Sequence, residues 1–359
     1  DVYKRQDSGF RAQLMWNRHL ISKRGDSLDI GFGWQEKDNE INFRSFYRYP
    51  RRASARQYWT AELLYRTEDQ NFTLGPQDDP LQRRTVARGN VYDYSFRPGW
   101  MKIRSLRRGF QQIVVHWYVQ YLDERFEFSP VEDLPPEIAV LPNLADESEF
   151  GDGRSETISF GVSWDWPFVR GRGFNTTGHS HRAWIFTSNS TWGSDLDFSQ
   201  VYLSSRWNTV RNRRWKFLLR GEIGYSDARV KERLVQAGDE LIPISVTELP
   251  FAYRFKAGGS QSVRGYSFES LSDNNIGANN IVTASAEVEL LFRENWAVAA
   301  FLDVGNAFND WGSSELKKGV GVGIRWYSIA GPIRLDIAQA LDEPGDPWRL
   351  HFTIGSPLL

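Results

Sequence analysis

The sequence predicts an all-β fold, a single antiparallel β-barrel that crosses a membrane with its strands. Three observations favour this fold class. Apolar residues recur at every second position along most of the chain, and no run of about 18 apolar residues could form a membrane-spanning helix. The 359 residues also include 15 Trp, 14 Tyr and 23 Phe. A soluble core rarely needs so many tryptophans, whereas membrane barrels place aromatic girdles at both bilayer interfaces.

The alternation can be followed from the first strand to the last. It is weaker over 9–17, 26–36, 40–48, 57–67, 86–97, 110–124, 154–165, 180–191, 197–208, 296–307 and 332–341, and clear over 214–225, 281–291, 319–326 and 348–355. In the last of these segments Trp348, Leu350, Phe352 and Ile354 share one face, opposite Arg349, His351, Thr353 and Gly355. The pattern gives about fifteen strands of roughly 9–12 residues, the length that crosses a bilayer at a tilt.

The polar face of these strands favours a barrel over a soluble sandwich. It carries Gly, Glu, Asp and Arg together, as in Lys216, Arg220 and Glu222 of segment 214–225. A charge that faces lipid at the midplane costs about 2–4 kcal/mol, so these residues are expected to line the lumen. The later strands keep the opposite face free of charge, while 86–97 leaves its assignment open.

Short and long connections alternate along the chain. Short ones are expected near 18–25, 49–56, 209–213, 292–295 and 328–331, and long ones near 69–85, 125–153 and 227–279. Outer-membrane barrels have short periplasmic turns and long external loops, so 125–153 and 227–279 are placed outside the cell. Residues 1–6 lead into no pattern and are interpreted as a fragment end or a non-native segment. Residues 7–359 are expected to form one barrel domain.

The composition excludes several classes of site. The formal net charge is −1 and no basic block suggests nucleic-acid binding. The chain has no cysteine, so it has neither disulfides nor thiolate metal ligands. His179 and His181 have a metal-ligand spacing but no evident third ligand, so no metal or other cofactor is expected. No catalytic motif is found, and we expect no enzyme.

One long connection contains a distinctive motif, AGGSQSVRGYSFES at residues 257–270. Its glycines permit tight turns and close backbone approach. Arg264 offers a planar guanidinium fork to a carboxylate, although an arginine in a loop is by default a solvated one.

The motif resembles a hallmark of the outer-membrane assembly-factor superfamily, V/I-R-G-F/Y, here Val263, Arg264, Gly265 and Tyr266. FLDVG, from Phe301 to Gly305, resembles the F-x-D-x-G strand of that family, and Glu287 matches the glutamate of the strand after the loop. Departures include Ile329 and Ala340, which stand where the family has proline.

The resemblance implies that loop 227–279 folds back into the lumen, where Arg264 meets Asp303, with Glu287 as the second choice of partner. Within the family the chain is most similar to the TamA branch, over roughly 7–359. The match begins at the second strand of a 16-strand barrel, so the first strand and the preceding POTRA domains are expected to be absent. The remaining charges, Arg220, Glu222, Arg325, Arg334 and Asp336, are interpreted as a hydrated network.

The resemblance further implies a function in the bacterial outer membrane. The protein would assist the insertion or secretion of unfolded outer-membrane clients, autotransporters above all, with a TamB-like inner-membrane-anchored partner and outer-membrane lipids around it. Clients would pair with the edge of the last strand at a lateral seam; the seam residues are Trp348, Leu350, Phe352, Thr353, Ile354 and Gly355. The alternatives are a BamA-like insertase, a two-partner secretion transporter, a passive porin-like channel, and a soluble β-propeller or carbohydrate-active enzyme.

Overall fold

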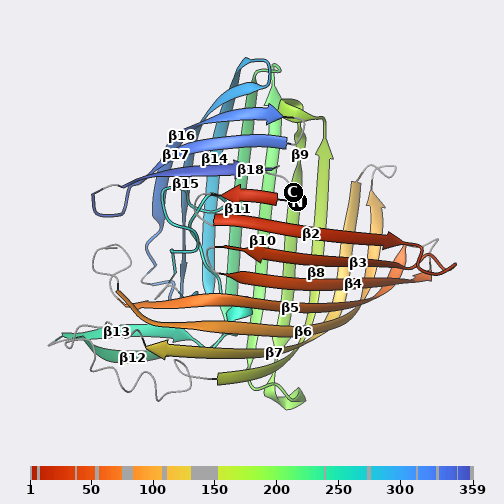
Figure 1. Cartoon of the computed structure of the whole chain (residues 1–359), viewed down its shortest axis with the longest axis vertical. Helices are drawn as coiled ribbons and strands as arrows, with labels where there is room; N and C mark the ends of the chain where they lie inside the picture. Colours follow the sequence, from red (N-terminus) through yellow and green to blue (C-terminus); the bar gives the residue numbers. More distant parts are fainter. Residues whose placement is uncertain are drawn as a thin grey trace.

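The structure is a computed structural model, and it describes most of the chain. The described residues are 2–5, 9–36, 39–52, 56–74, 84–106, 111–130, 153–237, 240–272, 276–312, 314–328, 331–345 and 347–355. Nearly all of them lie in strands or in the turns between strands, and they form one large curved sheet (Figure 1).

This sheet contains sixteen antiparallel strands in chain order, from β1 to β11 and then from β14 to β18. Their bounds are β1 Val2–Arg5, β2 Gly9–His19, β3 Ser27–Gln35, β4 Glu40–Arg52, β5 Gln57–Leu74, β6 Arg84–Leu106, β7 Gln111–Pro130, β8 Gly153–Arg170, β9 Thr177–Ser188, β10 Phe198–Arg211, β11 Trp215–Asp227, β14 Asn280–Arg293, β15 Trp296–Phe308, β16 Lys317–Ser328, β17 Gly331–Ala340 and β18 Trp348–Ile354. The all-β antiparallel fold is thereby confirmed, and each of the fifteen expected strands matches one of β2–β11 and β14–β18.

Three features differ from the expected pattern. Residues 2–5, where no strand is expected from the sequence, form β1 and pair with β2, which brings the sheet to sixteen strands. The connection 227–279 is not a plain loop, because it contains the hairpin of β12 (Val230–Ala237) and β13 (Glu240–Thr247). The expected long loops are also shorter than predicted, since β5 runs to Leu74 and β7 to Pro130. Where strands continue to pair beyond the bilayer, their alternation also continues. The sequence pattern therefore does not mark where such a strand ends.

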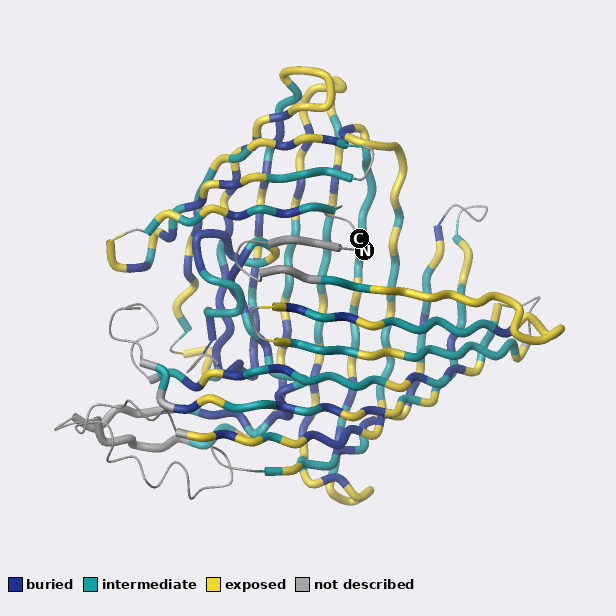
Figure 2. Tube along the Cα trace, viewed as in Figure 1, coloured by how far each residue is buried: buried dark blue, intermediate teal, exposed yellow. Residues whose placement is uncertain are grey.

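Exposure alternates along the strands as a barrel requires (Figure 2). In β11 the aromatic and aliphatic residues Trp215, Phe217 and Leu219 are exposed on the outer face, while Lys216 and Leu218 are buried inside. The ambiguous segment 86–97 is also resolved by burial. Its outward positions in β6 are aromatic, with Tyr94 and Phe96 exposed, and its inward positions Asp93 and Ser95 are buried.

The helical content of the described residues is confined to short 3-10 segments: η3 (Gly173–Asn175), η4 (Ser190–Trp192) and η5 (Phe251–Tyr253). Among the described residues, no helix has the length and apolar character needed to span a membrane.

The two ends of the sheet meet. The first strand, β1, lies beside the last strand, β18, but each pairs only with its other neighbour within the part of the chain that the structure describes (Figure 1). The ring of strands is therefore interrupted at one place, a seam between β1 and β18 without a backbone ladder.

Candidate functional site

The connection between β11 and β14 enters the lumen and packs against the inner face of the last strands. Two antiparallel bridges, between Phe255 and Ala278 and between Ala257 and Leu271, fold it into a narrow loop. An apolar cluster attaches this loop to β14, β15 and β17; its buried members are Phe255, Ala257, Val263, Tyr266, Leu271, Ala278, Ile281, Ala307 and Ala340. We call residues 255–278 the lumen loop. Its apolar side chains are buried although they line the inside of a barrel.

Glycines permit the close approach of the lumen loop to the wall. Gly265 has a φ of +99°, which L side chains rarely adopt, and a Cβ there would lie 2.8 Å from the backbone N of Ala340. On the wall, a Cβ on Gly319 would lie 1.9 Å from the backbone O of Arg264. Any larger residue at Gly319 would therefore push the loop away from β16.

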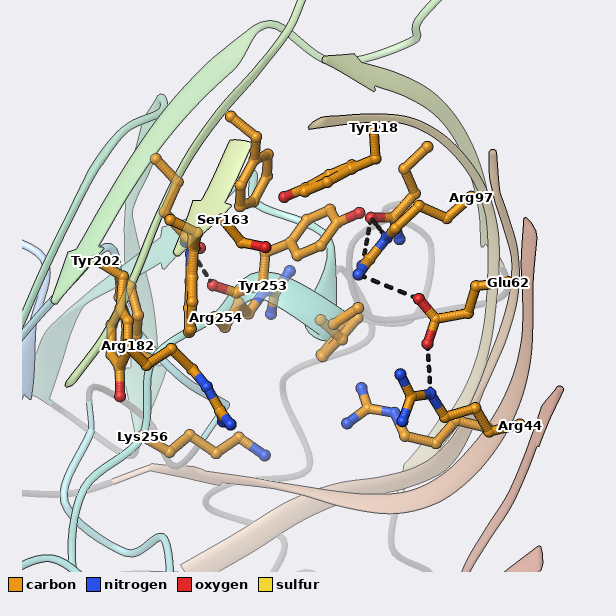
Figure 3. A pocket seen from close by; sticks show the side chains of 18 of the residues that line it. Arg44, Glu62, Arg97, Tyr118, Ser163, Arg182, Tyr202, Tyr253, Arg254 and Lys256 are labelled. Carbon is orange, nitrogen blue, oxygen red and sulfur yellow. Dashed lines mark hydrogen bonds and ion pairs between the residues drawn. The ribbon is translucent and has the colours of Figure 1, made fainter. Parts of the chain in front are cut away.

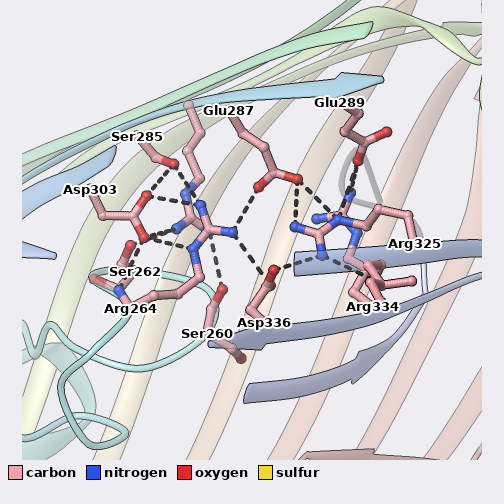
Figure 4. Close-up of polar contacts among 12 residues, drawn as sticks. Ser260, Ser262, Arg264, Ser285, Glu287, Glu289, Asp303, Arg325, Arg334 and Asp336 are labelled. Carbon is pink, nitrogen blue, oxygen red and sulfur yellow. Dashed lines mark hydrogen bonds and ion pairs between the residues drawn. The ribbon is translucent and has the colours of Figure 1, made fainter. Parts of the chain in front are cut away.

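Arg264 lies at the centre of a buried ion network (Figure 4). Its Nε and Nη2 donate to the two carboxylate oxygens of Asp303 at 2.7 and 3.0 Å, which is a bidentate pairing. Its Nη1 donates to Oε2 of Glu287 at 2.7 Å, and its guanidinium carbon lies 3.3 Å from the ring centroid of Phe301. The Arg264 side chain is 3% exposed, and that of Asp303 is 0% exposed.

A second arginine extends the network along the wall. Arg325 of β16 donates from Nη2 to Oε1 of Glu287 at 2.7 Å, and its Nη1 lies 2.6 Å from Oδ1 of Asp336. Glu287 therefore bridges Arg264 and Arg325. A Cβ on Gly323 would lie 2.0 Å from Asp336 Oδ1, so this glycine provides the space for the Arg325–Asp336 pair. These residues lie on β14, β15, β16 and β17, so the arginine network connects four consecutive strands through the lumen loop.

Backbone groups of the lumen loop are held as well. Arg220 of β11 donates from Nη2 to the carbonyl of Ser262 at 2.6 Å. The Tyr266 hydroxyl donates to the carbonyl of Lys318 at 3.2 Å. The Gly265 N–H donates to Nε2 of His351, a buried residue of β18, at 3.0 Å. The motif thus contacts the strand that forms one side of the seam.

The electrostatics of the lumen loop keep Arg264 charged. Burial by itself lowers the pKa of this guanidinium, but the carboxylates of Asp303 and Glu287 more than offset that effect and raise the pKa above its ordinary value. For Tyr266, burial raises the pKa to about 12. Arg264 therefore stays charged and Tyr266 stays neutral near neutral pH.

The structure brings together most of the residues that the sequence singles out. Val263, Arg264, Gly265 and Tyr266 lie in the buried loop, where Arg264 contacts Asp303, Glu287 and Phe301 of the wall. Gly305 lies further along β15, next to Val282 and Thr283 of β14. Trp348, Leu350, Phe352 and Ile354 lie on the outer face of β18, Thr353 lies on its inner face, and Gly355 follows the strand with its N–H bound to the Pro332 carbonyl. The bond from the Gly265 N–H to His351 links the motif to β18, the strand that carries the seam residues.

Two roles differ from those expected. Arg325 and Asp336 were interpreted as hydrated lumen charges, but both are buried and belong to the arginine network. The dry surroundings arise because the lumen loop covers them, which alternation alone does not reveal. His351 was also missed. The row of glycines that faces the network, Gly319, Gly321 and Gly323, is the sequence signal that points to a second layer packed on β16.

The rest of the lumen is open. A cavity of ≈ 740 Å³ lies beside the wall of β4–β10, with paired Arg44, Glu62 and Arg97 on one side and Tyr202 and Lys256 on the other (Figure 3). By contrast, only ≈ 40 Å³ of space remains next to Arg264.

No group of three or more candidate metal ligands occurs among the described residues. His179 and His181 stack on each other with ring centroids 4.7 Å apart, beside Trp166 and Trp207. They are thus part of an aromatic cluster.

Comparison with known proteins finds similarity to BamA in sequence and to BamA and CdiB in structure. Over an alignment of 125 residues this chain is 30% identical to the outer membrane protein assembly factor BamA of Nitratidesulfovibrio vulgaris, and the alignment covers 30% of this chain and only 16% of that protein. Among solved structures, BamA from Haemophilus ducreyi lacking POTRA domains 1–3 matches with a TM-score of 0.66 and 17% identity, over 99% of this chain and 69% of that one. CdiB from Escherichia coli matches with a TM-score of 0.58 and 14% identity, over 98% and 61%.

The two structural matches show a shared barrel fold, and the family match extends further. The Omp85 superfamily domain matches residues 1–357, which is almost the whole chain. With sixteen strands, an apolar outer face and a lumen closed on one side by its own loop, this chain is a β-barrel protein of the bacterial outer membrane and belongs to the Omp85 superfamily.

Proposed function

We propose that this protein is an outer-membrane assembly and translocation factor that receives client strands at the seam between β1 and β18. The observation that carries the proposal is the unpaired contact of these two strands. An edge strand in a bilayer leaves N–H and C=O groups without partners, which is costly in hydrocarbon. A client strand that pairs with the edge satisfies those groups by β-augmentation. No catalytic step is part of this role.

The arginine network supports the proposal because it stiffens one side of the seam. It links β14–β17 to the lumen loop, and the loop reaches β18 through Gly265 and His351. These contacts position β18, a strand of seven residues, although among the described residues it has no backbone ladder with β1. A template strand that is held in place at the seam is the arrangement that strand exchange requires.

The finer assignment is a TamA-like factor. Its clients would be autotransporter-type barrels, and it would work with a TamB-like partner that is anchored in the inner membrane. The support is the resemblance of segments 16–28 and 189–199 and of the C-terminal third to that branch. The second candidate is a BamA-like insertase, which the 30% identity to a BamA over 125 residues favours.

A crosslinking experiment tests the seam. The chain has no cysteine, so Thr353→Cys is a unique site on the inner face of β18. We expect it to form disulfides with cysteines placed in the last strand of a stalled client. The matched control is Ser163→Cys, which lines the lumen cavity on the opposite wall. Crosslinks at Ser163 and none at Thr353 would contradict the seam and favour secretion through the lumen, as in a two-partner transporter.

The porin-like alternative makes a different prediction. A passive channel would show a steady, selective conductance that Arg264→Ala leaves unchanged. For an assembly factor whose lumen loop is held by Arg264, we expect the same substitution to change the conductance, because the released loop alters the pore. Planar-bilayer recordings of both forms distinguish the two functions.

A further inference from the structure

The outer surface of β5–β10 carries an apolar groove of ≈ 890 Å³, far from the seam. One side of it is a row of residues that pair directly across six strands: Trp59, Trp100, Trp117, Val162, Ile185 and Val201. The other side is formed by residues two positions further along, namely Pro98, Val119, Phe160, Thr187 and Ser199. Its volume lies within the range of about 300–1,000 Å³ that is typical of small-ligand pockets.

The end of the groove that lies on β5, β6 and β7 is aromatic. Trp100 and Trp117 stack with ring centroids 4.4 Å apart, and Trp59 pairs with Trp100 across β5 and β6. All three lie near the short-turn ends of their strands, where a membrane barrel meets the periplasmic interface. Tryptophan prefers this depth because its ring is largely apolar and its N–H is polar.

Basic side chains lie directly beyond these tryptophans. The Arg51 guanidinium carbon is 5.4 Å from the Trp59 ring centroid, and Arg51 is exposed. Lys102 and Arg104 follow Trp100 at alternate positions of β6 and therefore share its outward face. The apolar groove, which has room for a hydrocarbon chain, thus ends beside a group of basic side chains.

The same end of the barrel is basic all round. Among the described residues in its turns and adjoining strand ends, the basic ones include Lys23, Arg24, Arg51, Arg56, Lys102, Arg104, Arg170, Arg172, Arg211, Arg213, Arg214 and Arg293, whereas the acidic ones are fewer and include Asp26, Asp29, Glu289 and Glu294. The long connection 125–153 at the other end is acidic in sequence. The described residues are therefore polarised in charge, with an excess of cations at the short-turn end, which faces the periplasm in outer-membrane barrels.

We propose that this groove binds an anionic glycerophospholipid, with one acyl chain between the two rows and the phosphate against Arg51 and Lys102. The groove lies on the face that the bilayer covers, so acyl chains are the medium that fills it. Charge complementarity selects the headgroup, since basic residues near a membrane surface attract anionic lipids. The site lies on the wall opposite the seam and is separate from the proposed client path.

The first experiment measures lipid adducts on the purified full chain in detergent by native mass spectrometry, with dioleoyl-phosphatidylglycerol as the probe. We expect the double variant Arg51→Gln/Lys102→Gln to lower its affinity about tenfold, because each basic residue beside a lipid phosphate contributes a several-fold factor. The control is Arg213→Gln, which removes a cation at the same end of the barrel but under β10 and β11. Equal losses in the two variants would mean a diffuse basic ring and would overturn the site.

A second pair of variants tests the acyl chain. Val162→Trp fills the groove from one of its sides, and Val322→Trp adds the same bulk to the exposed outer face of β16. We expect only the first to reduce binding of phosphatidylglycerol. Glycerol phosphate, which has no acyl chain, should not bind; if it binds as well as the lipid, or if an adduct of two protein chains replaces the lipid adduct, the proposal is wrong. Heat-modifiable migration on gels verifies that each variant is folded.

Discussion

The last strands and the first strands of this barrel follow the same alternation, yet their inner faces differ. Inside β14–β17, the C-terminal wall, Arg264 and Arg325 are 3% and 0% exposed and the lumen loop leaves ≈ 40 Å³ of space. Inside β2–β4, the N-terminal wall, the inward-facing Met15 is 52% exposed, and Arg44 is 52% exposed beside the cavity of ≈ 740 Å³. Figure 2 shows the same contrast in burial.

The difference teaches that a barrel wall acquires a core only where a second layer covers it. The sheet pairs equally well on both walls, since each strand finds its neighbour by backbone hydrogen bonds. Only the C-terminal wall, however, receives the lumen loop, which excludes water from its charges. An ion pair there is worth far more than the same pair on the N-terminal wall, because screening by water is lost.

The largest expected effect comes from Arg264→Ala. It removes the bidentate partner of the buried Asp303 and one of the two arginines that hold Glu287, and breaking a buried ion pair typically costs about 3–5 kcal/mol. Arg44→Ala on the N-terminal wall removes a half-exposed partner of Glu62 and should cost at most about 1 kcal/mol. Urea unfolding of both variants, followed by tryptophan fluorescence, measures the two costs. Equal costs would mean that the two walls do not differ in dielectric environment.

A glycine pair sharpens the comparison without changing any charge. Gly319→Ala places a methyl group against the Arg264 carbonyl and should destabilise by about 1–3 kcal/mol, as overpacking does. Gly31→Ala on β3 also faces the lumen, but no atom lies within 4 Å of its Cβ position. We expect that variant to be neutral or slightly stabilising. The same urea unfolding experiment measures the stability of both variants. If Gly319→Ala does not lower the free energy of unfolding, the lumen loop does not pack tightly on β16.

Hydrogen exchange should reveal the same contrast in dynamics. Amides of β2–β4 have few buried side chains above them, whereas those of β14–β17 lie beneath the lumen loop. We expect the amides of the N-terminal wall to exchange at least about tenfold faster, because local opening there exposes less buried apolar surface. Exchange mass spectrometry of the folded protein in detergent checks this, and indistinguishable protection would contradict it.

The smallest effect concerns the turn between β2 and β3. Hydrogen bonds from the side chains of Ser22 and Tyr47 lower the pKa of Asp26 to about 2. A lowered folded-state pKa gives stability above the unfolded value near 4 that is lost as the pH falls toward 2. Asp26→Asn should therefore destabilise the protein slightly at neutral pH and make no difference near pH 2. Unfolding curves at the two pH values test the difference.

Much of the candidate site follows from residue order alone. Parity places Asp303, Glu287 and Arg325 on the inner faces of their strands, and the V-R-G-Y motif identifies the loop that joins them. The partners of Arg264 could not be ranked completely, because Asp336 and Ser285 also reach its guanidinium from other strands. Which of these charges are dry depends on where the loop lies, and no local pattern encodes that position.

By itself the sequence determined fifteen of the strands, the inner and outer faces of most of them, and the arginine that joins loop and wall, because these depend on the two-residue repeat and on a local motif. The tertiary structure decided which wall is packed, that His351 connects the motif to the seam, and that Trp59, Trp100 and Trp117 align into one groove. Those features depend on register between strands and on the docking of a loop. Both bring together residues that are distant in sequence, and they are set by the closing of the sheet rather than by any single segment.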